Sequence, residues 1–229
     1  STDKWLNLIK NWKEEHPLKM RPNDLLSPMD ILKEINEQFE NSIIVTDVGQ
    51  HQMLVSQYAE ITEGKQMIMS GGLGTMGYGL PGGIGAKIGN PDRPVIVISG
   101  DGGVQMNIQE LATAVLEELP VILCIFNNEY LGMVRQWQTL FYEKHYSATV
   151  LDDGVDYVKL SEAMGATARR VKTQEEFEKA FADALKSKTP FVIDCIIDSD
   201  DKVWPMVAPG KPINESFDEE DYNATQGGN

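Results

Sequence analysis

Six short apolar segments, separated by stretches with helical spacing, are the feature that most constrains the fold of this chain. Strands that alternate with helices favour an α/β fold, in which a mostly parallel sheet carries helices on both faces. We expect strands at Ser42–Asp47, Gln66–Met69, Val95–Ser99, Val121–Phe126, Ala166–Val171 and Phe191–Ile197. We expect helices near residues 50–59, 77–89, 107–118, 131–140, 156–164 and 173–187.

The segments outside this pattern divide the chain into three parts. Residues 1–22 read as an amphipathic helix that ends near Pro17, followed by a linker. Ser27-Pro28 has the form of a helix start, and the helix it opens runs to about Glu40. We therefore expect one folded domain at residues 23–198, and a polar, acidic tail at residues 199–229 that is at most partly ordered.

Composition excludes several classes of partner. The formal net charge of −15 argues against a nucleic-acid surface, which needs a basic patch. No apolar run approaches the roughly 18–20 residues of a membrane helix, and the first residues lack the signal-peptide pattern, so we expect a cytoplasmic protein. Cys124 and Cys195 lie inside apolar runs, which predicts buried, reduced thiols.

The residues that directly follow the expected strands carry the unusual chemistry. In an open α/β sheet, ligands bind outside the carboxyl ends of the strands. An acidic chain that binds phosphates there must supply a metal ion or converging backbone N–H groups. The candidate segments are Asp47–Gln52, Ser70–Gly77, Ser99–Gly103 and Asn127–Met133.

One of these segments fits a dinucleotide site. Gly72-Leu73-Gly74-Thr75-Met76-Gly77 has the form G-x-G-x-x-G, and Asp101 follows at about the distance of a ribose-binding acid. The same glycines are equally compatible with close packing of a helix on a strand. The hexapeptide therefore leaves both alternatives open.

Two other strand ends favour a magnesium site. Asp101 stands among Gly100, Gly102 and Gly103, and 24 residues separate Gly102 from Asn127-Asn128. One helix and one strand fit that gap, which places the two strand tips side by side. Magnesium takes about six oxygen ligands. Asp101, the Asn128 amide oxygen and the Tyr130 carbonyl can supply three, and two diphosphate oxygens and a water complete the shell.

The pair Gly100-Asp101-Gly102 and Asn127-Asn128 resembles the signature of thiamine-diphosphate enzymes. The resemblance narrows to the acetohydroxyacid (acetolactate) synthase catalytic subunit and covers roughly residues 20–212. The segments that carry it are Val48–Gln52, Gly72–Gly77, Leu131–Gln138 and Pro205–Pro209.

The resemblance implies a set of site residues. Asp101, Asn128 and the Tyr130 carbonyl would hold Mg²⁺, and Met76 would be the bulky residue that bends the cofactor into a V. For His51 the alternative is a helix-start residue with an incidental hydrogen bond, and for Met76 it is core filling. The cofactor contacts implied in full are Val48, Gly49, Gln50, His51, Gly74, Met76, Asp101, Gly102, Gly103, Asn128, Tyr130, Leu131, Gly132 and Met133.

Trp137 resembles the tryptophan that lines the pocket of the second substrate. In that family the residue favours 2-oxobutanoate over pyruvate. The spacing of Leu131, Val134 and Trp137 is also that of an ordinary apolar helix stripe. Both interpretations stay open at this point.

The implied function is decarboxylation of pyruvate and its condensation with a second 2-oxo acid, pyruvate or 2-oxobutanoate, in branched-chain amino-acid biosynthesis. We expect no catalytic residue in this chain, because the glutamate that activates the cofactor belongs to a separate pyrimidine-binding domain. Implied partners are that domain, an FAD domain, further copies of the chain through the apolar stretch Leu73–Ile88, and a regulatory subunit. The alternatives are another thiamine-diphosphate carboligase or 2-oxo acid decarboxylase, an NAD-binding dehydrogenase domain, and a degenerate domain kept for assembly.

Overall fold

The computed structural model describes residues 2–38, 41–151 and 154–226. The chain divides into two compact units. The larger unit is Asn23–Asp201, and the smaller one combines Ser1–Pro22 with Lys202–Asn229.

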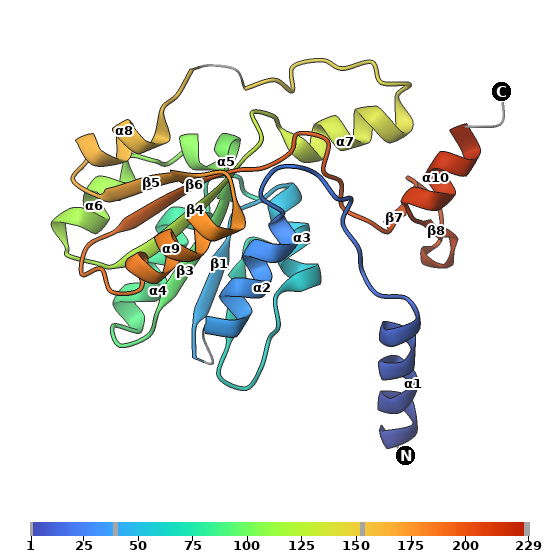
Figure 1. Ribbon diagram of the computed structural model, residues 1–229, viewed down its shortest axis with the longest axis horizontal. Coiled ribbons are helices and arrows are strands. Elements are labelled where there is room, and N and C mark those ends of the chain that lie inside the picture. The colour runs from blue at the N-terminus through green and yellow to red at the C-terminus, as the bar shows by residue number, and fades with distance from the viewer. Residues whose placement is uncertain (1, 39–40, 152–153, 227–229) are drawn as a thin grey trace. The chain divides into compact units, whose positions relative to one another are not determined.

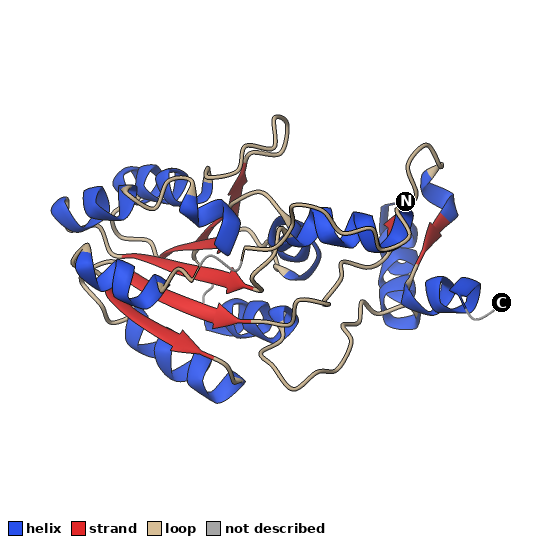
Figure 2. Cartoon of the chain, turned by 90° about the horizontal axis from the view of Figure 1, so that it is seen from above, coloured by secondary structure: helices blue, strands red, loops and turns tan. Residues whose placement is uncertain are grey.

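The larger unit is built on a six-stranded sheet with the order β2-β1-β3-β4-β6-β5, in which every neighbouring pair is parallel. Figures 1 and 2 show the strands running in one direction. The α/β fold with a parallel sheet is therefore confirmed. The strands are β1 (Ile43–Thr46), β2 (Gln66–Met69), β3 (Val95–Gly100), β4 (Val121–Asn127), β5 (Thr167–Val171) and β6 (Phe191–Ile196).

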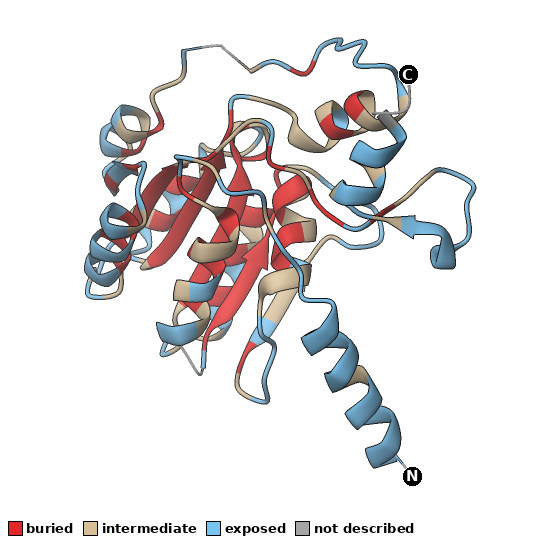
Figure 3. Cartoon of the chain, turned by 45° about the vertical axis from the view of Figure 1, so that its right-hand side comes forward, coloured by how far each residue is buried: buried red, intermediate tan, exposed pale blue. Residues whose placement is uncertain are grey.

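Helices cover both faces of this sheet (Figure 1). On one face lie α4 (Gly79–Gly89), α6 (Glu110–Leu116) and α8 (Tyr157–Ala163). On the other lie α2 (Pro28–Gln38), α3 (Gln50–Tyr58) and α9 (Gln174–Ala184), while α7 (Gly132–Phe141) follows the end of β4. All residues of β1, β3 and β4 are buried (Figure 3), because strands covered on both faces expose neither set of side chains.

Alternating residues of the strands enter two cores. Val95 and Val97 of β3 join the cluster beneath α4, α6 and α8, whereas Ile96 and Ile98 point to the opposite face. Cys124 and Cys195 are buried free thiols, as the sequence predicts.

The strand order creates a switch point between β1 and β3. After β1 the chain adds β2 on one side and then returns to add β3 on the other. The connections that leave β1 and β3 therefore diverge to opposite sides, which opens a crevice at their carboxyl ends. The sheet thus provides the site for a ligand where the sequence places its unusual residues.

The expected helix at residues 107–118 is wrong in extent. Its regular part is α6, and a separate short helix, α5 (Asp101–Gln105), begins directly after β3. Two glycines in α5 disfavour a helix by intrinsic propensity. Here they are required by packing instead, because a Cβ at Gly103 would lie 2.8 Å from Oδ1 of Asp47, and one at Gly102 would lie 2.8 Å from Cδ2 of Leu131.

The apolar stretch Leu73–Ile88, which we expect to contact further copies of the chain, packs partly on its own sheet through α4. Leu80 and Ile84 are buried in the core cluster. Leu73 and Ile88 at the ends of the apolar stretch are 93% and 62% exposed. The other exposed residues of the stretch are Gly74, Thr75 and Gly85, whereas Gly77, Gly79 and Gly83 are buried.

The smaller unit has more regular structure than an acidic tail predicts. It contains α1 (Thr2–Glu15), the antiparallel pair β7 (Met206–Val207) and β8 (Ser216–Phe217), the 3-10 turn η1 (Ile213–Glu215) and α10 (Glu219–Gln226). The Trp204 ring lies 5.9 Å from that of Phe217 and 6.1 Å from that of Tyr222, so an aromatic cluster anchors this segment. Within the described part of the chain, no helix is long and apolar enough to cross a membrane.

Candidate functional site: a cleft at the ends of β1, β3 and β4

A cleft opens at the carboxyl ends of three neighbouring strands. It encloses about 90 Å³. Every expected cofactor-contacting residue except Gly74 lines it, together with five residues that were not expected: Leu54, Gly100, Phe126, Val134 and Ile197. The expected residues that line it are Val48, Gly49, Gln50, His51, Met76, Asp101, Gly102, Gly103, Asn128, Tyr130, Leu131, Gly132 and Met133.

Two of the expected metal ligands, Asn128 and Tyr130, lie in the turn after β4, and the third, Asp101 at the end of β3, is hydrogen-bonded to that turn. Asp101 accepts hydrogen bonds from the backbone N of Gly102 (Oδ1, 2.9 Å) and of Glu129 (Oδ2, 2.7 Å). Asn128 Oδ1 accepts from the backbone N of Tyr130 at 3.0 Å. Glu129 between them has φ +61°, a conformation that non-glycine residues adopt at a cost. The turn is thus held to the tip of β3 by the Asp101 carboxylate.

The Asp101 carboxylate is in an unusual electrostatic environment. Burial raises its pKa to about 7, the hydrogen bonds from Gly102 and Glu129 act to lower it, and the charge of Asp194 raises it further. A bound cation would favour the ionised form and reverse this shift. Its oxygens and those of Asn128 are the hard ligands that Mg²⁺ prefers.

His51 fills the floor of the cleft between two glycines. A Cβ at Gly49 would lie 2.8 Å from the His51 ring and one at Gly100 would lie 3.0 Å from it, so both positions need glycine. Burial lowers the pKa of His51 to about 4, although Asp47 acts in the opposite direction, so the ring is neutral at pH 7. Its Nε2 atom is buried and has no hydrogen-bond partner among the described residues. Such an atom is what a ligand oxygen in the cleft would satisfy.

Most of the folded part of the chain matches a known protein family. Residues 47–195, more than half of the chain, match the model of the thiamine pyrophosphate enzyme, C-terminal TPP binding domain. The chain belongs to this family. Thiamine pyrophosphate (TPP) is thiamine diphosphate, so the match leaves no support for the dinucleotide interpretation of Gly72–Gly77.

Curated relatives of this TPP-binding domain include acetolactate synthase large subunits. The protein of Cyanidium caldarium is 42% identical over 213 residues, which cover 92% of this chain and 36% of that protein. The isozyme 2 large subunit of Escherichia coli is 37% identical over 209 residues, which cover 91% of this chain and 37% of that protein. The chain therefore spans about a third of the length of the curated relatives it matches.

A solved structure shows the same fold. The thiamine diphosphate-dependent 4-hydroxybenzoylformate decarboxylase of Rhodococcus jostii RHA1 superposes with a TM-score of 0.72 at 25% sequence identity. The superposition covers 78% of this chain and 34% of that one.

Gln50 lines the cleft of the TPP-binding domain, but its side-chain N–H groups are hydrogen-bonded to other parts of the protein. Its Nε2 donates to Oε1 of Gln136 at 2.9 Å and to the backbone O of Asp201 at 2.7 Å. Both amide hydrogens are therefore used, and the residue ties α3 to α7 and to the segment after β6. A diphosphate could meet its backbone N–H, but not its side-chain N–H groups without breaking these bonds.

Asp47 is a residue that the sequence interpretation left out of the site. It is 1% exposed, and its carboxylate accepts from the backbone N of Val48 (2.6 Å), Gly77 (2.9 Å) and Gly79 (2.8 Å). It thereby fixes the start of α4 to the end of β1, next to Met76. Its position at a strand end, where a buried carboxylate needs donors, was the available signal.

Two expected site residues lie outside the cleft. Gly74 is exposed, with φ +61°, and a Cβ there would lie 3.8 Å from Val48. Trp137 lines a separate, more open groove of about 710 Å³. Met133 and Val134 line both hollows, so the groove of Trp137 borders the cleft.

Proposed function

We propose that this chain is the diphosphate-binding and metal-binding part of an acetohydroxyacid synthase, which decarboxylates pyruvate and joins it to a second 2-oxo acid. The observation that supports this most is the convergence of Asp101, Asn128 and Tyr130 in one cleft, at the switch point of the sheet of a TPP-binding domain. The names of the curated relatives support the reaction, and the shared cofactor fold supports the site.

The residues present fit Mg²⁺ as the bridge to the diphosphate. Among the described residues, no Lys or Arg lines the cleft, and the chain carries a net charge of −15. No three His, Cys, Asp or Glu side chains gather as a metal site in the described part of the chain either. One carboxylate, one amide oxygen and one carbonyl are an incomplete shell for Mg²⁺, so diphosphate oxygens would complete it.

The chain's own residues position the cofactor rather than react. When bound, thiamine diphosphate supplies a nucleophilic carbon and accepts electrons during decarboxylation and carbon–carbon bond formation. Asp101, Asn128 and the Tyr130 carbonyl would hold the metal, and Nε2 of His51 would meet a phosphate oxygen. Met76 lines the cleft and would support the bent cofactor, and the apolar side chains of Leu54, Leu131 and Met133, which also line it, would exclude water from the bound cofactor.

This chain supplies only part of the proposed enzyme. It spans about a third of the length of the curated relatives it matches. The activating glutamate, the FAD site and the rest of the acetohydroxyacid synthase would come from other domains or chains. We propose that the assembled enzyme is a cytoplasmic oligomer that acts on 2-oxo acids. A regulatory subunit is a further partner of this proposal.

A thiamine-diphosphate decarboxylase is the second candidate. The structural similarity to the 4-hydroxybenzoylformate decarboxylase favours it. The curated similarities of 37–42% identity over nine-tenths of the chain favour the synthase.

Calorimetry of the chain with thiamine diphosphate tests the site. Binding should require Mg²⁺ and disappear in EDTA, and Asp101→Ala should abolish it. Asp92→Ala is the matched control, because Asp92 is an exposed carboxylate at the opposite end of β3. Equal affinity with and without metal, or equal loss in both variants, would contradict the proposal. Pyruvate turnover by this chain alone would show that the activating group is not elsewhere.

A further inference from the structure

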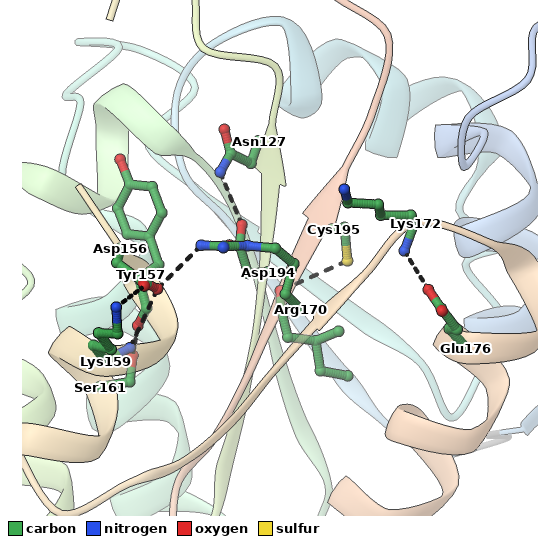
Figure 4. Close-up of polar contacts among 11 residues, drawn as sticks. Asn127, Asp156, Tyr157, Lys159, Ser161, Arg170, Lys172, Glu176, Asp194 and Cys195 are labelled. Atoms are coloured by element: carbon green, nitrogen blue, oxygen red, sulfur yellow. Dashed lines mark hydrogen bonds and ion pairs between the residues drawn. The ribbon is translucent and has the colours of Figure 1, made fainter. Parts of the chain in front are cut away.

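The buried carboxylate of Asp194 is hydrogen-bonded to the residue that precedes the turn Asn128–Tyr130, which carries two of the proposed metal ligands. Asp194 is 0% exposed in the middle of β6, and neither it nor its partners line the cleft. Its Oδ1 accepts a hydrogen bond from Nδ2 of Asn127 at 2.9 Å, and its Oδ2 accepts one from Nε of Arg170 at 2.8 Å (Figure 4). Both carboxylate oxygens are therefore engaged, one by the last residue of β4 and one by a cation on β5.

Arg170 extends this link to a helix. Its second nitrogen contacts Oδ1 of Asp156 at 3.1 Å, so one guanidinium bridges two carboxylates (Figure 4). Asp156 is the N-cap of α8 and accepts from the backbone N of Lys159. The planar fork of arginine suits this arrangement, and a lysine ammonium could not reproduce its geometry.

Tyr157, the first residue of α8, makes a second link, to the end of β3, where the proposed metal ligand Asp101 lies. The hydroxyl of Tyr157 donates to the backbone O of Asp101 at 3.2 Å and accepts from Nε2 of Gln105 at 2.8 Å. Tyr157 is 3% exposed. The start of α8 is thus connected to the end of β3 through Tyr157 and to the end of β4 through Asp156, Arg170 and Asp194.

These contacts act on the backbone that presents the metal ligands. Asn127 is the residue before Asn128, and holding its side chain restricts the peptide between them. An ionised group buried in a sheet needs compensation by charge and hydrogen bonds, so Asp194 is costly unless Arg170 and Asn127 remain in place. Side chains one step behind metal ligands commonly fix the orientation of those ligands.

We propose that Asp194 and Arg170 are positioning residues of the metal site: they hold the Asn127–Asn128 end of β4 in the geometry that ligates the metal. This inference rests on the proposed function, because it assigns the pair to the metal site of that function. It differs from a purely structural role in what it predicts. A structural pair changes only the stability of the sheet, whereas a positioning pair changes the metal requirement of cofactor binding.

The test measures thiamine diphosphate binding to the chain over a range of Mg²⁺ concentrations. In Asp194→Asn and Arg170→Met, half-maximal binding should need about tenfold more Mg²⁺ or higher. Arg170→Lys should need less Mg²⁺ for half-maximal binding than Arg170→Met, but more than the wild type. Arg169→Met is the matched control, because Arg169 is on the same strand and forms an exposed ion pair with Asp183 at 2.7 Å. Its Mg²⁺ requirement should equal that of the wild type.

Thermal unfolding and hydrogen exchange separate the outcomes. Lower thermal stability of both variants with an unchanged Mg²⁺ requirement would overturn the proposal. If Asp194→Asn does not fold, the two Arg170 variants decide, because that side chain is 38% exposed. Without cofactor or metal, the amides of residues 127–130 should exchange faster in Arg170→Met than in Arg169→Met, and equal rates would also overturn it. A wild-type chain that binds no thiamine diphosphate would instead contradict the proposed function.

Discussion

Replacement of Asp47 by asparagine tests whether the Asp47 carboxylate fixes the start of α4 to the end of β1. The carboxylate is 1% exposed and receives three backbone N–H groups, from Val48 at 2.6 Å, Gly77 at 2.9 Å and Gly79 at 2.8 Å. Asparagine has the same shape but only one acceptor oxygen. If that oxygen keeps Val48 and Gly77, the amide NH₂ faces the N–H of Gly79, so that a donor meets a donor.

The expected loss of stability follows from these contacts. Losing a hydrogen bond to a charged group costs about 1.5–3 kcal/mol, and leaving the buried N–H of Gly79 unpaired costs about 1–3 kcal/mol more. The two costs partly overlap, so we expect the free energy of unfolding to fall by about 3 kcal/mol. This is a large share of the roughly 5–15 kcal/mol by which a domain is stable.

Urea unfolding followed by tryptophan fluorescence measures this difference. Asp183→Asn is the control, because the Asp183 carboxylate is 46% exposed and pairs only at the surface with Arg169. That change should cost less than about 1 kcal/mol. A loss below 1 kcal/mol for Asp47→Asn, or equal losses for the two variants, would refute the assignment of Asp47 as the clamp between β1 and α4.

Two further predictions concern the walls of the site. Gly132→Ala should destabilise the fold by about 1–3 kcal/mol and weaken cofactor binding, because its Cβ would press on Oε1 of Gln50 and Nδ2 of Asn128. Gly85→Ala, at an exposed position of α4 with open space around it, should instead stabilise the fold by up to about 1 kcal/mol in the same unfolding assay. In the complete enzyme, Trp137→Leu should reduce the preference for 2-oxobutanoate over pyruvate by about tenfold or more, and an unchanged product ratio would place Trp137 outside the acceptor pocket.

The sheet could be predicted because its strands carry strong local signals. Val121–Phe126 is apolar throughout, as a strand covered on both faces must be, and β4 (Val121–Asn127) extends only one residue further. Helix α5 could not be predicted, since glycines at positions 102 and 103 disfavour a helix locally. Tertiary contacts override that preference: Val104 is 2% exposed, and no side chain larger than hydrogen fits beside Asp47 and Leu131.

Much of the candidate site was accessible from the sequence for a topological reason. Parallel strands place their carboxyl ends at one edge, so residues far apart in the chain, such as His51, Asp101 and Asn128, meet in one cleft. The side chains behind them were not accessible. Asn127 and Asp194 are 67 residues apart, and no local spacing indicates that they pair.

Asp194 nevertheless left a trace that sequence reasoning can use. It is the one charged residue inside the apolar run Phe191–Ile197, and a charge in a fully covered strand requires a partner of opposite sign. Arg170 on β5 is that partner, and its charge offsets that of Asp194. Asp101, and not Asp194, lines the cleft. Arg170 thus lies outside the cleft, and a diphosphate that enters the cleft meets no Lys or Arg side chain among the described residues that line it. This arrangement makes a divalent metal the remaining source of positive charge, which ties the proposed metal dependence of binding to the placement of Arg170 as well as to Asp101.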